Sequence, residues 1–357
     1  MNPDPARVPP RPPGPLRVAL IGSSFGGYGG IESFMLAIAG GLPAAGGVEA
    51  RVVFKRAAGF ALQPALAAAA GRATLVNRGS LALWRAIARA DVVHLQNISP
   101  DVVLLARLLG RPLLLTVHNH SLGRASWRQR LWHCCLRLAD RRFYVSEFVR
   151  RTWEDGAPRP GSRVVAPISR LPEGRRAESG RRGFVFAARW IPNKGIETLV
   201  EAYARAGLDP ERWPLRMIGD GPLRAPVEQA IRARGLRGIT VEGFLSEAEK
   251  HDAIRGARFM VIPPQTREDF GLTAIEARAV GVPCIITRDG GLPEAAGAEA
   301  LACEPGDAAG LADCLRTAAA MPDAEYAGRA ERTFLSLQGQ LVRPADYAEF
   351  YREMVRR

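Results

Sequence analysis

The sequence predicts an α/β protein made of two successive domains, each a parallel β-sheet with helices on both faces. Apolar segments of strand length alternate with longer segments of helical periodicity from Leu16 to Val145, and the same alternation starts again at Phe184. The intervening residues, 167–182, are rich in Pro, Gly, Ser and charge, as is typical of a linker. A chain of 357 residues is long enough for two domains with separate cores.

These patterns give a division of the chain. We expect a disordered arm over residues 1–15, a first domain over 16–166, the linker over 167–182, a second domain over 183–340 and a closing helix over 341–357. The Pro-rich start has no apolar core segment, and no stretch of about 18 uncharged apolar residues occurs. Neither a signal peptide nor a membrane-spanning helix is therefore expected.

The first domain begins with a strand, a glycine-rich connection and a helix. The strands expected in this domain cover Leu16–Ile21, Ala50–Phe54, Val92–Leu95, Leu113–Val117 and Arg142–Val145. Glycines at 26–30 let a ligand approach the backbone, and the helix that follows from Ile31 can receive a phosphate at its N-terminus. A dinucleotide site is disfavoured because Lys55 and Arg56 stand where an acidic ribose-binding residue would follow the second strand. A flexible surface turn is the alternative.

His118 and a basic helix complete this domain. His118 ends an apolar strand, where α/β folds bind ligands, although a structural role in capping the next segment is equally open. A helix is expected over 127–142. The residues spaced for its buried face are Trp127, Leu131, Cys134 and Leu138, and those of its basic face are Arg130, Arg137 and Arg141. The basic face is either simply solvated or a membrane-contacting surface.

The second domain repeats the strand and helix alternation. The expected strands are Phe184–Ala188, Leu215–Ile218, Ile239–Val241, Phe259–Ile262 and a further strand after Pro283. Gly219-Asp220-Gly221-Pro222 predicts a turn, and Ser246 with Glu249 predicts a capping box.

The segment from Pro263 to Glu294 predicts a loop, a helix over Leu272–Val280 and a strand. Glu268 in the loop and Glu276 in the helix could both face one ligand. The helix N-terminus at Gly271–Thr273 would receive a phosphate, and carboxylates beside it can accept hydrogen bonds from sugar hydroxyls. A solvated acidic loop followed by an ordinary exposed helix is the alternative.

The net charge of +13 lies in the first half. Residues 1–165 hold 22 Lys and Arg against 9 Asp and Glu, whereas residues 166–357 hold 27 of each. This asymmetry suggests an anionic partner of the first domain, such as a membrane surface, a phosphorylated acceptor or nucleic acid. Only three of the 49 basic residues are Lys. The five cysteines show neither zinc-ligand spacing nor a disulfide framework, which fits a reducing cytoplasm.

Taken together, these residues resemble the retaining glycosyltransferases of family 4, glycosyl transferases group 1. The resemblance covers nearly the whole chain from Leu16. It depends on the following motifs in order: GGIE at 29–32, His118, FAARWIPNKGIETLVEAY at 186–203, GDGP at 219–222, and Glu268 separated by seven residues from Glu276. It implies the GT-B fold, in which two facing Rossmann-like domains with parallel sheets enclose a cleft.

The resemblance also implies roles for particular residues. Arg189 and Lys194 would hold the donor diphosphate, Glu268 the hydroxyls of the transferred sugar, Glu276 the nucleotide ribose, and His118 would lie near the sugar ring. The catalytic set is Arg189, Lys194, Glu268 and His118. The donor-binding set is Gly29, Gly30, Gly219, Gly243, Phe244, Leu245, Phe270, Gly271, Leu272, Thr273 and Glu276. No metal ligand is expected, since the chain has no Asp-x-Asp pair and protein cations would neutralise the charge that grows on the diphosphate.

The function expected from this resemblance is retaining transfer of a sugar without a metal or other cofactor. The donor would be a UDP-sugar or GDP-mannose type compound, and the acceptor a hydroxyl of a lipid-linked or cell-surface polysaccharide precursor. We expect a cytoplasmic protein, peripheral at an anionic membrane surface. The alternatives are a nucleotide-sugar epimerase on the same fold and a basic nucleic-acid-binding protein. The second is disfavoured because the sequence lacks interleaved aromatic and basic residues.

Overall fold

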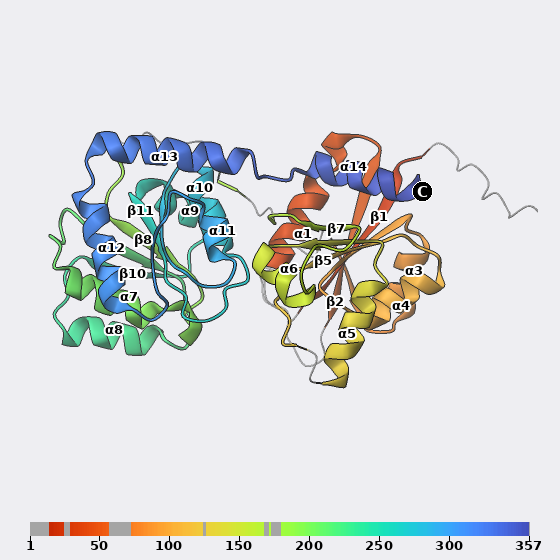
Figure 1. Cartoon of the computed structure of the whole chain (residues 1–357), viewed down its shortest axis with the longest axis horizontal. Coiled ribbons are helices and arrows are strands. Elements are labelled where there is room, and N and C mark those ends of the chain that lie inside the picture. The colour runs from red at the N-terminus through yellow and green to blue at the C-terminus, as the bar shows by residue number, and fades with distance from the viewer. Residues whose placement is uncertain are drawn as a thin grey trace, which may run out of the picture. The chain divides into compact units, whose positions relative to one another are not determined.

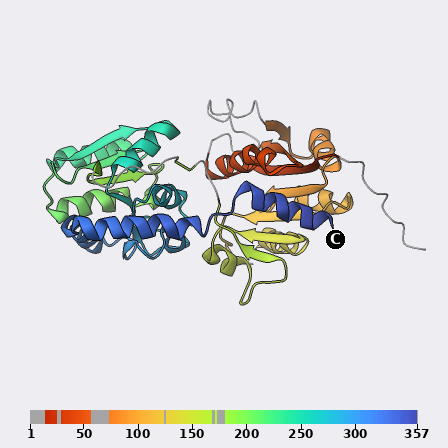
Figure 2. The ribbon, with the colours of Figure 1, turned by 90° about the horizontal axis from the view of Figure 1, so that it is seen from above.

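The computed structural model describes residues 14–24, 29–56, 73–123, 126–167, 171–172 and 180–356. These residues form two parallel sheets, of seven and six strands, with helices packed on them (Figures 1 and 2). Internal contacts divide the described chain into two compact units. The first comprises described residues up to 115, with 134–141 and 343–356, and the second comprises 116–133 and 142–342.

The seven-stranded sheet has the order β3-β2-β1-β4-β5-β6-β7. Its strands are β1 (Leu16–Ser24), β2 (Val48–Arg56), β3 (Ala73–Asn77), β4 (Val92–Gln96), β5 (Leu113–Val117), β6 (Arg141–Tyr144) and β7 (Ser162–Val164). β1 pairs in parallel with both β2 and β4, so that Val18 lies opposite Ala50 on one side and Val92 on the other. The strand order therefore reverses at β1. The central strands β4 and β5 are buried throughout, as their nearly continuous apolar sequences predict.

Helices follow most of these strands. They are α1 (Gly30–Gly41), α3 (Leu81–Ala88), α4 (Pro100–Leu108), α5 (Trp127–Arg137), α6 (Glu147–Trp153) and α14 (Pro344–Val355), with a short 3-10 turn, η1, over Pro43–Ala45. Ser80 and Ser146 cap α3 and α6 by accepting hydrogen bonds from backbone N–H groups of the first turn. The C-terminal α14 packs on the first unit beside α1, where the Tyr351 hydroxyl lies 2.7 Å from Nδ1 of His94.

The structure corrects the prediction for residues 127–142 in two ways. α5 ends at Arg137, and Arg141 and Arg142 belong to β6. The expected buried face is wrong, because Trp127, Leu131, Cys134 and Leu138 are exposed. The residues that face the interior are Gln129, His133, Cys135, Leu136 and Ala139. The buried side of the segment includes the polar residues Gln129 and His133, so an apolar pattern at helical spacing does not identify it. The helix ends before Asp140, whose N–H donates to the Leu113 carbonyl in β5.

The six-stranded sheet has the order β10-β9-β8-β11-β12-β13. Its strands are β8 (Phe184–Ala187), β9 (Leu215–Ile218), β10 (Ile239–Gly243), β11 (Phe259–Ile262), β12 (Cys284–Thr287) and β13 (Leu301–Cys303). The order reverses between β8 and β11, which are adjacent and parallel, with Phe184 opposite Phe259. All residues of β8, β11 and β12 are buried, in agreement with their uninterrupted apolar character.

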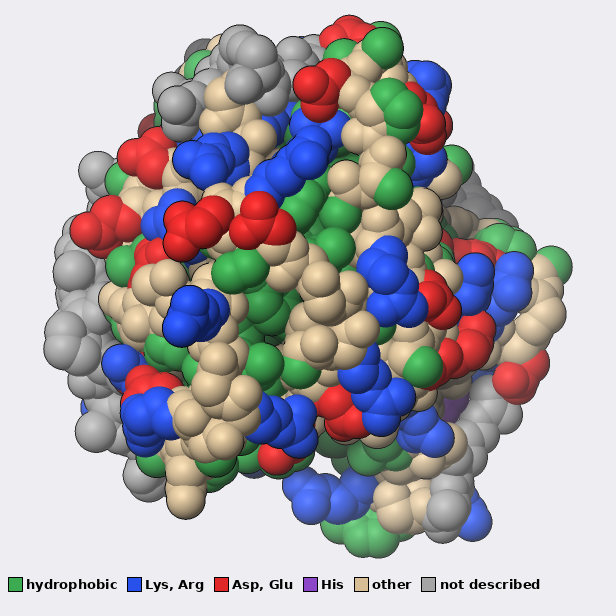
Figure 3. Space-filling model, turned by 90° about the vertical axis from the view of Figure 1, so that its left-hand side faces the viewer, with side chains coloured by type: hydrophobic (Ala, Val, Ile, Leu, Met, Phe, Trp, Pro, Cys, Tyr) green, Lys and Arg blue, Asp and Glu red, His purple; other side chains and the backbone are tan. Residues whose placement is uncertain are grey.

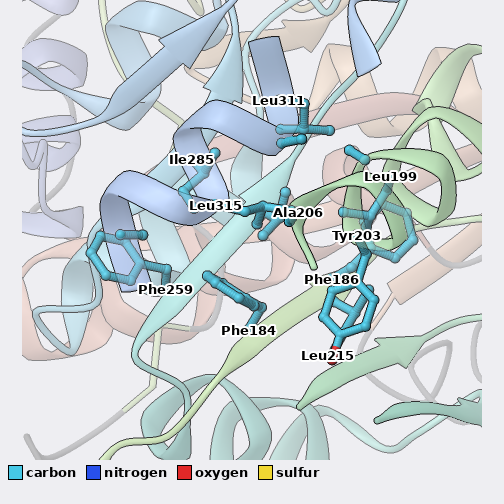
Figure 4. Packing of buried hydrophobic residues seen from close by; sticks show 14 of the residues in the cluster. Phe184, Phe186, Leu199, Tyr203, Ala206, Leu215, Phe259, Ile285, Leu311 and Leu315 are labelled. Atoms are coloured by element: carbon cyan, nitrogen blue, oxygen red, sulfur yellow. The ribbon is translucent and has the colours of Figure 1, made fainter. Parts of the chain in front are cut away.

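Two groups of helices cover this sheet. They are α7 (Ile196–Ala206), α8 (Arg224–Ala233), α9 (Glu247–Gly256), α10 (Leu272–Ala279), α11 (Leu292–Ala296), α12 (Ala308–Ala320) and α13 (Asp323–Gln338), with a 3-10 turn, η3, over Pro192–Lys194. α7 packs against α12, whereas α10 packs against α9, α11 and α13. Figure 4 shows side chains of α7, α12 and the central strands meeting in one buried cluster, among them Tyr203, Leu315 and Phe259. Ser246 and Glu249 form the predicted capping box of α9.

The predicted arm over residues 1–15 lies almost entirely outside the described residues, and so does most of the predicted linker over 167–182. Within the described ranges, no helix combines the length and the apolar character needed to cross a bilayer. The two-sheet α/β architecture expected from the sequence is confirmed.

Candidate functional site

The reversal of strand order at β8 and β11 defines the candidate site. In parallel α/β sheets, ligands bind beyond the carboxyl ends of the strands at such a reversal, because the connections that follow the two strands run to opposite faces and leave a crevice. The connection after β8 carries Arg189 and Lys194, and the connection after β11 carries Glu268. Three of the four predicted catalytic residues therefore follow these two adjacent strands.

Lys194 and Glu268 are in direct contact. The Lys194 ammonium lies 2.5 Å from Oε2 of Glu268, and the two side chains are 22% and 17% exposed. Both charges are thus within reach of a ligand from solvent. The Arg189 side chain is exposed, and its guanidinium makes neither a hydrogen bond nor an ion pair with any residue in the described ranges. The site therefore offers one free cation and a second cation whose carboxylate partner a more highly charged anion could replace.

Backbone contacts fix the Lys194 turn against the end of β11. Gly195 has φ of +68°, and a Cβ at this position would overlap the carbonyl oxygen of Pro263. Only glycine combines this conformation with so close an approach. The N–H of Gln265 donates to the carbonyl of Asn193 at 2.9 Å, and its side-chain amide donates to Thr198 at 2.6 Å.

The Glu268 loop is held from the other side by the connection after β12. The N–H of Glu268 donates to the Asp289 carboxylate at 2.6 Å, and its carbonyl accepts from the N–H of Gly291 at 2.8 Å. Arg267, directly before it, has φ of +37°, which is unfavourable for a side chain with a Cβ. A strained residue held by fixed neighbours is typical of a site whose geometry serves a ligand.

Glu276 lies in a more buried setting than Glu268. Its Oε1 accepts a hydrogen bond of 3.1 Å from Lys250 of α9, and its Oε2 lies 3.0 Å from the same ammonium. Burial raises the pKa of Glu276 to about 6, and the positive charge of Lys250 opposes this rise. The sequence suggested that Glu268 and Glu276 could face one ligand, and the structure pairs each carboxylate with a different lysine.

The N-terminus of α10 separates these two carboxylates along the chain. Gly271 caps the helix with φ of +103°, Leu272 and Thr273 are its first residues, and the Phe270 side chain is buried beneath them. The first N–H groups of any helix lack partners within that helix and carry positive partial charge. This terminus can therefore receive a phosphate, as the sequence predicted for these four residues.

Four further predicted residues, Gly219, Gly243, Phe244 and Leu245, lie at or just beyond the carboxyl ends of β9 and β10. The N–H of Gly219 donates to the carbonyl of Gly243 at 2.7 Å and so joins the ends of the two strands. Phe244 is 81% exposed, and Leu245 next to it is partly buried. An exposed aromatic ring beside two glycines at the carboxyl edge of a sheet can stack on a planar group.

The remaining predicted residues follow strands of the seven-stranded sheet. Gly29 precedes α1, its N–H donates to the carboxylate of Glu32 at 3.1 Å, and Gly30 is the first helical residue. Burial raises the pKa of Glu32. His118 directly follows β5, and burial lowers its pKa to about 3. The imidazole is accordingly neutral at physiological pH and can donate or accept a hydrogen bond without carrying charge.

Sequence reasoning missed the partner of Glu276. Lys250 is one of only three lysines in a chain in which arginine is the usual cation. That rarity was the available signal, but the sequence did not place α9 beside α10, whose packing brings the two side chains together.

The two parallel sheets have the GT-B fold, which solved glycosyltransferase structures share. The solved structure of a glycosyltransferase from Rickettsia africae has a TM-score of 0.77 over 96% of this chain and 99% of its own, at 17% identity. Anabaena Alr3699/HepE in complex with UDP has a TM-score of 0.75 over 96% and 100%, at 14% identity. These likenesses establish the shared fold.

The family follows from the sequence matches. Residues 28–167 match the family model Glycosyltransferase Family 4, and residues 169–332 match Glycosyl transferases group 1. The chain therefore belongs to the glycosyltransferases of family 4, group 1. A GDP-mannose-dependent α-(1-6)-phosphatidylinositol dimannoside mannosyltransferase of Mycobacterium tuberculosis is 31% identical over 131 residues, 37% of this chain and 32% of the relative. The stretches matched in the curated relatives span 15% to 60% of their lengths.

Proposed function

We propose that this glycosyltransferase moves a sugar from a nucleoside diphosphate sugar to a hydroxyl group of a lipid-linked or cell-surface polysaccharide precursor, with retention of anomeric configuration. The observation that carries the proposal is the contact between Lys194 and Glu268 beyond β8 and β11. A cation that can bind a diphosphate, Lys194, thus lies in contact with a carboxylate that can bind sugar hydroxyls, Glu268. The UDP in the Anabaena protein and the GDP-mannose in the mycobacterial relative's name support a donor of this class.

The proposed roles follow from charge and exposure. Arg189 and Lys194 stabilise the negative charge that grows on the departing diphosphate, assisted by the N-terminus of α10. When the diphosphate replaces Glu268 as the ion-pair partner of Lys194, the Glu268 carboxylate becomes available to accept hydrogen bonds from the sugar hydroxyls. Glu276 accepts from the ribose, and Phe244 stacks on the base.

Retention follows from the same arrangement. The cations hold the diphosphate beside the anomeric carbon as the glycosidic bond breaks, so that a phosphate oxygen can accept the proton of the incoming hydroxyl. The acceptor then bonds to the face that the diphosphate left. His118, with its pKa near 3, supports the sugar ring as a neutral hydrogen-bonding group. Because protein cations carry the diphosphate charge, the reaction proceeds without a divalent metal.

The acceptor side is proposed to lie at an anionic membrane. α5 exposes Trp127 and Leu131, and Arg128 and Arg137 on the same helix are exposed. An apolar surface flanked by arginines is typical of helices that lie in the membrane interface. Arg141, which the sequence assigned to this surface, instead donates to Glu353 at 2.8 Å.

One experiment tests the reaction. The purified protein is incubated with UDP-glucose, UDP-N-acetylglucosamine or GDP-mannose and a lipid-linked acceptor library, with EDTA in excess. Transfer should continue in EDTA, and proton NMR of the early product from an α-configured donor should show an α linkage. A β-linked first product would exclude retention, and activity that is lost in EDTA and restored by magnesium would exclude the metal-free mechanism. Conversion of the donor without any acceptor would instead indicate an epimerase.

A further inference from the structure

The cluster around Glu276 contains a residue with no role so far. Lys250 extends from the first turns of α9 toward α10. Its ammonium lies 3.1 Å from Oε1 and 3.0 Å from Oε2 of Glu276, and it also donates to Oε2 of Glu247 at 3.0 Å. The Lys250 side chain is 16% exposed and that of Glu276 only 6%. The ammonium of Lys250 therefore lies between a buried carboxylate, that of Glu276, and an exposed one, that of Glu247, whose side chain is 46% exposed.

A carboxylate in this position needs a cation to stay charged. Desolvation favours the protonated carboxyl form, and the neighbouring Glu247 favours it too, whereas Lys250 favours the carboxylate. Only the ionised form offers both oxygens as acceptors, because the protonated form turns one of them into a donor. Oε2 of Glu276 accepts no aligned hydrogen bond from the residues that the structure describes, and so retains capacity for a ligand.

The other elements packed against α10 supply no competing charge at this point. β11 and β12 present Phe259–Ile262 and Cys284–Thr287. Arg278, the basic residue at the end of α10, donates to the carbonyl of Ala295 in α11 and to the hydroxyl of Ser336 in α13. His251, beside Lys250, has its pKa lowered by burial and is neutral. Lys250 is thus the cation that acts on Glu276.

A metal ion is a less suitable explanation of the cluster. Glu247, His251 and Glu276 bring potential ligand atoms within 4.8 Å of one another, which is the spacing of a metal site. The Lys250 ammonium is already 3.0 Å from a carboxylate oxygen of each glutamate. A divalent cation would have to displace it and then stand beside its positive charge.

We propose that Lys250 is a positioning residue of the nucleotide site, which holds the Glu276 carboxylate ionised and oriented as a two-oxygen acceptor for the 2′ and 3′ hydroxyls of the donor ribose. The inference rests on the proposed function, in which Glu276 binds the ribose. It makes Lys250 a determinant of the preference for ribonucleotides over 2′-deoxyribonucleotides, and leaves the transfer step to Lys194 and Arg189.

Calorimetric titration of UDP and 2′-deoxy-UDP, and of GDP and 2′-deoxy-GDP, tests the role in the full-length protein with EDTA present. The wild-type protein should bind the ribonucleotide on the order of tenfold more tightly. Lys250→Met should weaken ribonucleotide binding by about tenfold at pH 7, reduce the ribose preference to less than twofold, and recover part of the affinity at pH 8.5, as Glu276 ionises. Lys250→Arg should keep most of the preference.

The matched control is Lys55→Met. Lys55 is buried and likewise donates to a carboxylate, that of Asp101 at 2.7 Å, and its removal should leave both nucleotide affinities unchanged. In the transfer assay, Lys250→Met should raise the KM of the donor about tenfold and change kcat by less than threefold. If Lys250→Met lost the same affinity for the ribonucleotides and the 2′-deoxyribonucleotides at every pH, the role of Lys250 would be merely structural and the proposal would be overturned.

Two further outcomes separate the proposals. If the wild-type protein binds the nucleotides but Lys250→Met keeps the same affinity and ribose preference, the role of Lys250 fails and the proposed function stands. If the wild-type protein binds no nucleoside diphosphate, the proposed function fails and the role of Lys250 with it. If Lys250→Met does not fold, the pH dependence of the wild-type protein tests the proposal. Its preference for ribonucleotides must decrease as the pH falls below about 6, where Glu276 becomes protonated.

Discussion

Lys194 and Lys250 each hold a glutamate, but the two pairs differ in burial. The Lys194–Glu268 pair is accessible to solvent, whereas Glu276 is almost completely buried against Lys250. An accessible pair exchanges partners at a modest cost, because water and the ligand can compensate each charge. A buried pair is expensive to separate, because one partner would be left as an uncompensated charge. We therefore expect Lys194 to change partners during catalysis and Lys250 to keep its own.

The first prediction compares two substitutions in the proposed donor site. Lys194→Ala should lower kcat about a hundredfold at saturating donor, because one preorganised charge on the leaving group is worth on the order of 3 kcal/mol. Glu276→Ala should act chiefly on the KM of the donor, because the ribose is bound equally in ground and transition states. Steady-state kinetics with varied donor separates the two effects. Near-normal turnover of Lys194→Ala would contradict the assignment.

The second prediction concerns the pH dependence of stability. The folded-state pKa of Glu276 is about 6, against an ordinary value of 4.5. Between these pH values the folded protein binds more protons than the unfolded chain, so this group makes stability fall as pH rises through the window. The full penalty above pH 6 is about 2 kcal/mol.

Glu276→Gln cannot ionise and should escape this penalty. Measured by urea unfolding, its free energy of unfolding relative to wild type should improve by about 2 kcal/mol between pH 4.5 and pH 7.5. Groups remote from Glu276 titrate alike in both proteins and cancel in the difference, and Lys250 stays protonated over this pH range. A constant difference across this range would show that Glu276 titrates normally.

At the scale of elements, the connection after β8 depends on one glycine. Gly195→Ala must both adopt φ of +68° and displace the Pro263 carbonyl, whereas Gly207→Ala at the end of α7 meets φ of +62° with open space around its Cβ. We expect a loss of about 1 kcal/mol in unfolding free energy for Gly207→Ala and of at least about 3 kcal/mol for Gly195→Ala. Only Gly195→Ala should also reduce kcat, since it moves Lys194. Equal losses would mean that the close approach to Pro263 is unimportant.

Elements that are buried throughout were the easiest to predict. β5 and β11 have the bounds expected from their apolar runs, and β9 also has its expected bounds although its Arg216 is only partly buried. β3, β7 and β13 were not predicted. β7 and β13 have three residues each, such as Ser162–Val164, which is too short to show a periodicity. The face of α5 was predicted wrongly, because its buried side includes the polar Gln129 and His133 and its apolar stripe is exposed.

The candidate site shows a similar limit of sequence reasoning. Each predicted residue could be assigned to a loop or helix that follows a strand, and motif order suggested a common ligand. The contact between Lys194 and Glu268, 74 positions apart, depends on β8 and β11 being neighbours, and strand order is not encoded in periodicity. The same holds for Lys250, whose partner became evident only from the packing of α9 on α10.

At the scale of the whole molecule, charge separates the two halves of the sequence. The excess of positive charge lies in residues 1–165, and the second half is balanced. Figure 3 shows the side of the molecule on which Figure 1 labels the helices of the second half, and basic and acidic side chains are interspersed on that face. A balanced surface gives little attraction to an anionic membrane, whereas clustered arginines attract it within about a Debye length. Charge alone does not identify a docking surface, and the exposed apolar residues of α5 supply the second signal.

The last prediction is that α5 binds the protein to anionic membranes. In co-sedimentation with vesicles of phosphatidylcholine and phosphatidylserine, wild-type protein should partition far better than with phosphatidylcholine alone, and less as salt increases. Combined Arg128→Ser and Arg137→Ser should lower the partition coefficient by about thirtyfold, at about 1 kcal/mol per arginine. Combined Trp127→Ser and Leu131→Ser should weaken binding even in high salt, because apolar insertion is not screened.

Leu335→Ser, which removes a side chain of α13 that is 56% exposed, is the matched control and should bind like wild type. Equal binding to neutral and anionic vesicles would refute electrostatic docking, and equal binding by the α5 variants and the control would place any membrane contact elsewhere on the chain.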